Sequence, residues 1–329
     1  MSSNPLCFPI ATFRPFTFLA NAHLQTLLGN IFRGPKLAFP SQRRLVQLPD
    51  GDRLVVHDCI PPGWTHGQRI VLLVHGLGGS HQSGYMSRLA TMLLPHGCRV
   101  LRMDLRGAGD GVALARKTYN AGCSHDVRAV ANEIGRLAPN SPLVLVGMSL
   151  GGNIVLKLAG ESAADPVANL AGVAAVSPPI DLERCAALMA LGRNRLYERW
   201  FLHGLLKQVR CQWRCCPDVP RIRFPPQLTL RRFDDLYTAP RGGFADALDY
   251  YRRCSAAQVV HRIQVPAFIL TARDDPFIAV ESFLKLPARS NVAVHVMDRG
   301  GHLGFVGADG AGGFRWAERR VVDWVMRRT

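Results

Sequence analysis

From Leu143 to Asn153 the chain reads Leu-Val-Leu-Val-Gly-Met-Ser-Leu-Gly-Gly-Asn. The four apolar residues at the start, two of them β-branched, predict a short buried strand. Gly147, Ser149 and Gly151 follow as Gly-x-Ser-x-Gly, where such a strand would turn into a helix. A side chain at either flanking position would collide with backbone in so sharp a turn, so both must be glycine. This pattern predicts a nucleophile elbow that lifts the Ser149 hydroxyl above the edge of a sheet.

The elbow depends on its context, because a serine between two glycines is more often an ordinary turn. Residues 153–160 supply a helical start and a terminating glycine. The N-terminus of that helix and the backbone N–H of Leu150 would point at an oxygen on a carbon attacked by Ser149. The prediction is therefore a serine hydrolase, which needs a second oxyanion donor, a base and an acid.

The second donor is expected after the apolar run Ile70–Val74, which predicts a strand buried on both faces. That run leads directly into His75-Gly-Leu77-Gly-Gly. A His-Gly followed by glycines after a buried strand is typical of an oxyanion loop, so the N–H of Leu77 is predicted to act together with that of Leu150. We interpret His75 itself as structural.

The acid and the base are expected after the last two strands. Asp274 and Asp275 follow the predicted strand 267–271, and a carboxylate at a strand end suits the acid of a triad. We prefer Asp275 and expect Asp274 to bond the turn. His302 lies between glycines after the final strand, in a loop able to bring an imidazole over Ser149. The order Ser, Asp, His is the order of an α/β-hydrolase.

The rest of the chain predicts an α/β-hydrolase fold with a mostly parallel central sheet and helices on both faces. Further strands are expected at Leu45–Leu48 and Leu54–Asp58 (an antiparallel hairpin), Arg99–Met103, Leu170–Val176 and Val292–Met297, and further helices at Tyr85–Leu94, Asp126–Leu137 and Phe314–Arg328. We divide the chain into a leader packing on the core (1–42), the first part of the core (43–180), a lid insertion (181–262) and the second part of the core (263–329).

The lid is predicted because the alternation of strand and helix stops after Asp181 and is replaced by Arg-rich helical sequence at Leu188–Lys207. Its large apolar side chains either line an acyl channel or form the core of the lid itself: Phe201, Leu202, Leu205, Leu206 and Trp213. In the leader, Asn21 is expected to cap a short helix that carries apolar residues on one face: Leu24, Leu27 and Leu28. We interpret His23 as structural.

Composition limits the class of protein. Length (329 residues) and a hydrophobic content of 48% allow one large α/β domain with an insertion. No run approaches the roughly 18 uncharged apolar residues of a spanning helix, and no secretory signal is recognised, so we expect a cytoplasmic protein. The net charge of +16 makes an anionic membrane a candidate peripheral partner, with no specific nucleic acid. The nine cysteines, including Cys211, Cys215 and Cys216, form no metal-type pairs and predict reduced thiols.

Several segments together resemble the YheT-like branch of the α/β-hydrolases, the AB hydrolase-4 family, nearly from end to end. The shared segments are Asn21-Ala-His-Leu-Gln-Thr-Leu, His75-Gly-Leu-Gly-Gly-Ser, Gly147-Met-Ser-Leu-Gly-Gly-Asn153, Phe233-Asp-Asp-Leu-Tyr-Thr-Ala239, Phe244-Ala-Asp-Ala-Leu-Asp-Tyr-Tyr251, Asp274-Asp-Pro-Phe277 and Gly300-Gly-His-Leu-Gly-Phe-Val-Gly307. The Phe233 and Phe244 segments lie in the predicted lid and are not general hydrolase motifs, so the resemblance is specific.

The resemblance implies a serine esterase, lipase or acyltransferase with a triad of Ser149, Asp275 and His302. Relatives in that family hydrolyse carboxylic esters or lipids, and fungal ones move medium-chain acyl groups onto ethanol. This chain departs from the family pattern at Ala108–Gly111 and in its cysteine-rich segment at 211–216. Both departures bear on the choice of substrate and leave the expected chemistry unchanged.

Three functions follow in order of preference. The first is hydrolysis of short- to medium-chain acyl esters or lipids through an acyl-serine, with no metal or organic cofactor. The second is acyl transfer to an alcohol, which uses the same residues. The third, of a different class, is a non-catalytic protein that binds membrane or nucleic acid through its basic surface; the predicted triad argues against it.

Overall fold

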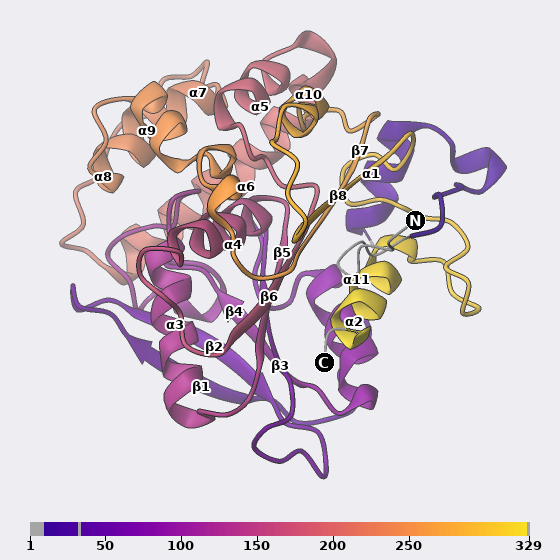
Figure 1. Ribbon diagram of the computed structural model, residues 1–329. Helices are drawn as coiled ribbons and strands as arrows, with labels where there is room; N and C mark the ends of the chain where they lie inside the picture. The colour runs from indigo at the N-terminus through magenta and orange to yellow at the C-terminus, as the bar shows by residue number, and fades with distance from the viewer. Residues whose placement is uncertain (1–9, 32–33, 328–329) are drawn as a thin grey trace.

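The computed structural model describes residues 10–31 and 34–327, and its centre is one eight-stranded sheet (Figure 1). The strands lie in the order β1-β2-β4-β3-β5-β6-β7-β8. Their bounds are β1 Gln42–Gln47, β2 Arg53–Cys59, β3 Ile70–Val74, β4 Arg99–Asp104, β5 Leu143–Met148, β6 Leu170–Val176, β7 Ala267–Ala272 and β8 Val292–Met297. Strand β2 pairs antiparallel with β1 and β4, and all other pairs are parallel. The predicted strands and the mostly parallel sheet are confirmed.

Helices cover both faces of the sheet, as predicted. In Figure 1, α3 and α4 lie on one side and α2 and α11 on the other. The helices are α1 Ala22–Ile31, α2 Gly84–Leu93, α3 Ser124–Leu137, α4 Leu150–Glu161, α5 Leu182–Met189, α6 Arg195–Cys215, α7 Leu230–Phe233, α8 Ala239–Gly242, α9 Ala247–Cys254, α10 Val280–Leu284 and α11 Trp316–Arg327. A π-helical turn, η5 (Asp234–Thr238), joins α7 to α8. Each face of the sheet has its own buried apolar cluster.

The central strands are apolar because both of their faces are covered. Every residue of β3 and β5 is buried. Val74, the last residue of β3, pairs with Met103 of β4 and with Gly147 of β5. The carboxyl ends of these three strands are therefore level, and the loops that follow them meet at one edge of the sheet, where ligands bind in open α/β sheets.

The segment between β6 and β7 contains five α-helices, α5 to α9, and no strand of the sheet. The Arg-rich sequence expected to be helical at Leu188–Lys207 is divided between two helices, because α5 ends at Met189 and α6 begins at Arg195. Between them the Asn194 side chain donates to the carbonyls of Leu188 and Pro276 at 2.8 and 2.7 Å. These bonds hold the break and tie it to the loop that follows β7. Within the described residues, no helix has both the length and the apolar character needed to cross a bilayer.

Helix α1 is present and capped as predicted, and its most buried residues are not the leucines that were expected to share one face. The Asn21 side chain accepts two backbone N–H bonds, at 2.9 and 3.1 Å. Leu27, expected to face the core, is 48% exposed, whereas Gln25, Thr26 and Gly29 are buried. A Cβ on Gly29 would lie 2.6 Å from the carbonyl oxygen of residue 303, so only glycine permits this contact. Residues 1–9 and 32–33 of the expected leader lie outside the described part of the chain.

Candidate active site

Ser149 lies in the turn between β5 and α4 with φ 51° and ψ −122°, a conformation that non-glycine residues rarely adopt. The two glycines leave no room for side chains. A Cβ on Gly147 would lie 2.3 Å from the carbonyl oxygen of Gly151, and one on Gly151 would lie 2.4 Å from that of Val74. The strained turn predicted from the sequence is therefore present, and backbone packing on both sides holds it.

The structure brings Ser149, His302 and Asp275 together from three loops. His302 Nε2 lies 2.9 Å from Ser149 Oγ, and its Nδ1 lies 2.8 Å from Asp275 Oδ2. The other oxygen of Asp275 accepts the backbone N–H groups of Phe277 and Ile278 at 3.2 and 3.1 Å. Because the carboxylate accepts the Nδ1 proton, Nε2 is left with a lone pair directed at the serine hydroxyl. This arrangement can transfer a proton from serine to histidine.

The two adjacent aspartates have different partners. Asp274 Oδ1 accepts the backbone N–H of Gly301 at 2.9 Å, so Asp274 holds the loop that carries His302. Burial raises the pKa of Asp274 above its usual value. Asp275, not Asp274, contacts the imidazole. The preference for Asp275 agrees with this geometry, whereas Asp274 bonds the histidine loop and not merely its own turn.

The predicted oxyanion donors border the same cavity as Ser149. Leu77 and Leu150 both line it, and neither backbone N–H donates to an acceptor within residues 10–31 and 34–327. Leu150 is the first residue of α4, where N–H groups have no partner inside the helix. On the loop of Leu77, the N–H of Gly76 donates to the Tyr85 hydroxyl at 2.9 Å, which helps to fix the position of that loop.

His75 is structural, as expected from its buried position. Its Nε2 accepts the backbone N–H of Leu105 at 3.0 Å, so its Nδ1 carries the proton and donates to the carbonyl of Gly76 at 2.8 Å. Full burial lowers the pKa of His75 and keeps the ring neutral. Both ring nitrogens are used in fixing the loop, which leaves His302 as the histidine that faces Ser149.

Sequence reasoning missed the part that α1 plays in this site. Thr26 Oγ1 accepts the backbone N–H of His302 at 2.9 Å. The Gln25 side chain bonds both backbone groups of Val306, donating to its carbonyl at 3.0 Å and accepting its N–H at 2.7 Å. These polar side chains face the core because they form hydrogen bonds with backbone groups of the loop that carries His302. The sequence signal for this role was the polar pair Gln25-Thr26 next to the leucines of the predicted helix.

A cavity of about 120 Å³ lies over Ser149 and beneath α6. Most of its lining is apolar, and the segment between β6 and β7, predicted to be a lid, contributes a large part of it. Of the five side chains proposed for an acyl channel, Phe201 and Leu205 line this cavity. Leu202, Leu206 and Trp213 do not line it and pack with Leu205 in an apolar cluster around α6. Phe201 and Leu205 are therefore placed where a channel lining would be, and Leu202, Leu206 and Trp213 pack among the inserted helices themselves.

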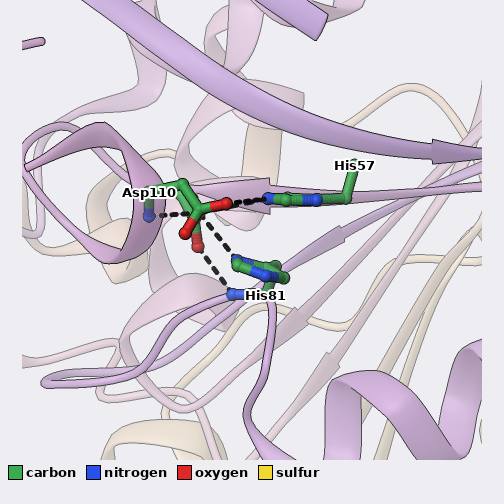
Figure 2. Close-up of side chains that lie close together, drawn as sticks. His57, His81 and Asp110 are labelled. Carbon is green, nitrogen blue, oxygen red and sulfur yellow. Dashed lines mark hydrogen bonds and ion pairs between the residues drawn. The ribbon is translucent and has the colours of Figure 1, made fainter. Parts of the chain in front are cut away.

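A second cluster of titratable side chains lies at the end of β4 (Figure 2). Asp104 is fully buried and accepts the His81 N–H at 2.6 Å, the His81 Nδ1 proton at 2.8 Å and the Asp110 N–H at 3.0 Å. The His57 and His81 rings stack with centroids 3.5 Å apart, and His57 Nε2 lies 3.3 Å from Asp110 Oδ2. The bonds from His81 and His57 hold the pKa of Asp104 far below its usual value, against the effect of burial.

This cluster has metal-ligand side chains within 4.8 Å of one another, but its geometry favours hydrogen bonding. The lone pairs of two face-to-face imidazoles lie in parallel planes and do not converge on one ion, and both Asp104 oxygens already accept protons. We interpret the cluster as a set of hydrogen bonds that fixes the segment around His81 to the end of β4. The other candidate group, at residues 123–126, is engaged as well, because Asp126 forms two bonds with Arg106.

Comparisons with known proteins agree with this architecture. The α/β hydrolase fold family matches residues 69–309 of the chain. The "Putative esterase YheT" of Escherichia coli (strain K12) is 33% identical over 321 residues, which cover 96% of this chain and 93% of that protein. The monoacylglycerol lipase ABHD2 of Mus musculus is 26% identical, covering 94% and 78% of the two chains.

Solved structures share the fold at lower identity. The Pyrococcus furiosus esterase Pf2001 superposes with a TM-score of 0.60 and 16% identity, over 98% of this chain and 99% of its own. The 2,6-dihydroxy-pseudo-oxynicotine hydrolase superposes with a TM-score of 0.59 and 19% identity, over 89% and 69%. With the sheet order, the elbow and the end-to-end match to a YheT protein, the chain belongs to the YheT-like branch of the α/β-hydrolase family.

Proposed function

We propose that this protein is a serine hydrolase that cleaves carboxylic esters through an acyl-serine intermediate. One observation carries the proposal: Ser149 Oγ, His302 and Asp275 form a continuous hydrogen-bonded chain, with contacts of 2.9 and 2.8 Å, at a strained turn. Relatives with esterase and lipase names support ester hydrolysis as the reaction class.

In the proposed mechanism, Ser149 Oγ attacks the ester carbonyl carbon while its proton moves to His302 Nε2. Asp275 keeps the imidazole in the required tautomer and stabilises its cation. The N–H groups of Leu77 and Leu150 bind the oxyanion. The imidazolium then protonates the departing alkoxide, which leaves as alcohol, and an acyl-serine remains. His302 next takes a proton from water, the hydroxide adds to the acyl carbon, and the acid leaves as Ser149 regains its proton.

The lining of the cavity supports an ester with an apolar acyl group. Apolar side chains from the core and the lid surround Ser149, including Leu182, Met189, Phe201 and Leu205. Burying each methylene of a chain among such side chains contributes about 0.8 kcal/mol. We propose short- to medium-chain acyl esters or lipid esters as substrates, and the lipase name of a relative is consistent with the latter.

The test is hydrolysis of p-nitrophenyl esters of increasing acyl length by the wild type and two variants. We expect Ser149→Ala to lower kcat on the order of 10⁶-fold. The control, Ser162→Ala, removes a hydroxyl that donates to the Leu158 carbonyl at the other end of α4, and it should keep full activity. Equal activity of Ser149→Ala and wild type would refute the nucleophile.

Acyl transfer to an alcohol uses the same residues, so product analysis separates it from hydrolysis. In the presence of added alcohol, a hydrolase yields mainly free acid, and a transferase yields mainly the new ester. We expect free acid from the wild type. Predominant ester formation would assign the acyl-serine to transfer, whereas complete inactivity of the wild type on all esters would remove the proposed reaction class.

A further inference from the structure

The outer face of α6 combines basic and apolar side chains in one continuous stripe. At 100° per residue, seven positions fall within about 60° of a single line along this helix. These positions, called the lid stripe below, are Leu196, Arg199, Trp200, His203, Lys207, Arg210 and Arg214, and all seven are exposed. Leu196 is 76% exposed and Trp200 is 62% exposed, which is unusual for side chains of this size. The stripe runs for about 30 Å.

The exposed charge of the segment that contains the lid stripe is almost purely positive. Residues 191–223 contain eight exposed cations: Arg193, Arg195, Arg199, Lys207, Arg210, Arg214, Arg221 and Arg223. Only one exposed acid, Asp218, lies in the same segment, and it already pairs with Arg116. Glu198 is buried and accepts the backbone N–H of Leu230. None of the eight cations forms an ion pair within the part of the chain that the structure describes.

This combination fits the surface of an anionic membrane. A basic helix with Trp and Leu on the same exposed side places its cations among lipid phosphates and inserts the apolar side chains at the headgroup level. Tryptophan also favours the membrane–water boundary because its ring is apolar and its N–H is polar. The phosphates of a nucleic acid would pair with the cations, but they would leave the exposed Leu196 side chain without an apolar partner.

The opposite face of α6 faces the candidate active site. Phe201, Leu205, Gln208 and Val209 line the cavity that contains Ser149. One helix therefore has its inner side over the nucleophile and its outer side free for a partner. We propose that the lid stripe docks on an anionic lipid surface, so that ester groups in that surface are presented next to the lid. The delivery of substrate by this docking rests on the proposed ester hydrolysis.

The experiment measures sedimentation of the full chain with vesicles in a Ser149→Ala background, so that binding is read without turnover. Vesicles of phosphatidylcholine containing phosphatidylserine are compared with pure phosphatidylcholine at low and high salt. The test variant is Lys207→Gln, Arg210→Gln, Arg214→Gln. Its control removes the same charges outside the lid, at exposed positions, in the variant Lys36→Gln, Arg43→Gln, Arg289→Gln. Circular dichroism establishes that both variants are folded.

We expect binding to phosphatidylserine vesicles at 0.1 M salt and its loss at 1 M, where the Debye length falls from about 10 to about 3 Å. At about 1 kcal/mol for each cation near an anionic leaflet, the test variant should bind ~100-fold more weakly. The control should bind like the parent protein. In a second readout, brominated lipids should quench tryptophan fluorescence of the parent and lose most of this effect in Trp200→Phe.

Three results would overturn the docking surface. These are no binding to anionic vesicles at low salt, an equal loss of binding in the test and control variants, and tight binding of the stripe to an oligonucleotide with none to vesicles. The p-nitrophenyl ester assay stays independent of all three, because soluble esters need no membrane. Active enzyme without vesicle binding would refute the stripe alone, and vesicle binding by an inactive enzyme would refute the reaction alone.

Discussion

Replacing Thr26 tests whether α1 positions the proposed base from outside the α/β core. Thr26→Val keeps the shape of the side chain but removes the oxygen that accepts the His302 N–H and donates to the Ala22 carbonyl. The His302 N–H would then be buried without an acceptor, which costs about 1–3 kcal/mol, and the lost bond to residue 22 adds about 1 kcal/mol. We expect the free energy of unfolding to fall by about 2–4 kcal/mol.

Activity should fall more than binding, because the hydroxyl holds the histidine and does not line the cavity. A displacement of the imidazole by up to about 1 Å should reduce kcat by about 10- to 100-fold with little change in KM. Thr26→Ser, which keeps the hydroxyl, should retain most of the activity and most of the stability. Urea unfolding and ester kinetics on the three proteins measure this. Wild-type kcat and stability in Thr26→Val would refute the positioning role.

Three further perturbations have directions set by the structure. Asp275→Asn should lower kcat by about 10⁴-fold, because it favours the wrong tautomer of the imidazole. Asp274→Asn keeps an oxygen for the Gly301 N–H and should lower kcat far less. A larger loss of kcat in Asp274→Asn would assign the acid to Asp274. Gly151→Ala should abolish soluble, active protein, because its Cβ would lie 2.4 and 2.5 Å from backbone oxygens. Gly204→Ala on α6 is the control: its Cβ would have no atom within 4 Å, and it should stabilise the protein by up to about 1 kcal/mol in thermal unfolding. Burial raises the pKa of Asp234 to about 6, so the free energy of unfolding should fall by up to ~3 kcal/mol as pH rises from about 4 to above 6. Asp234→Asn should flatten the plot of the free energy of unfolding against pH over this range. An unchanged slope in the variant would contradict the raised pKa.

The sign of the Asp234 effect follows from proton binding. The folded state holds this proton up to about pH 6, and the unfolded chain releases it near its ordinary value of about 4. Between those two values the folded state binds more protons than the unfolded state, so the free energy of unfolding decreases as pH rises. Above pH 6 both states are ionised, and the contribution stays constant.

Local sequence was sufficient wherever one segment determines its own conformation. The apolar run before Gly147 specifies a strand buried on both faces, and the elbow requires glycine at two positions because of contacts within a few residues and with the neighbouring strand. Placing a carboxylate after β7 and a histidine after β8 requires only the order of strands along the chain. For these reasons the fold, its strands and the loops of the candidate site could be predicted from sequence.

Helix boundaries were less certain because tertiary bonds terminate some helices. The break between α5 and α6 depends on Asn194, whose side chain bonds the Pro276 carbonyl on another loop. Hydrophobic periodicity extends across this break and gives no sign of it. The burial of Gln25 and Thr26 in α1 could not be predicted for a related reason, because both side chains bond backbone groups about 280 residues away along the chain.

The class of sheet, the strained serine turn and the loops that carry the proposed acid and base could be read from the sequence, since they follow from contacts between near neighbours and from strand order. Three other features could not: Asp275 contacts His302 while Asp274 holds its loop, Phe201 and Leu205 line the cavity while Leu202, Leu206 and Trp213 do not, and one side of α6 is exposed and basic. Each of these features depends on distances between side chains of different segments, which are set only when the packed core brings their backbones together.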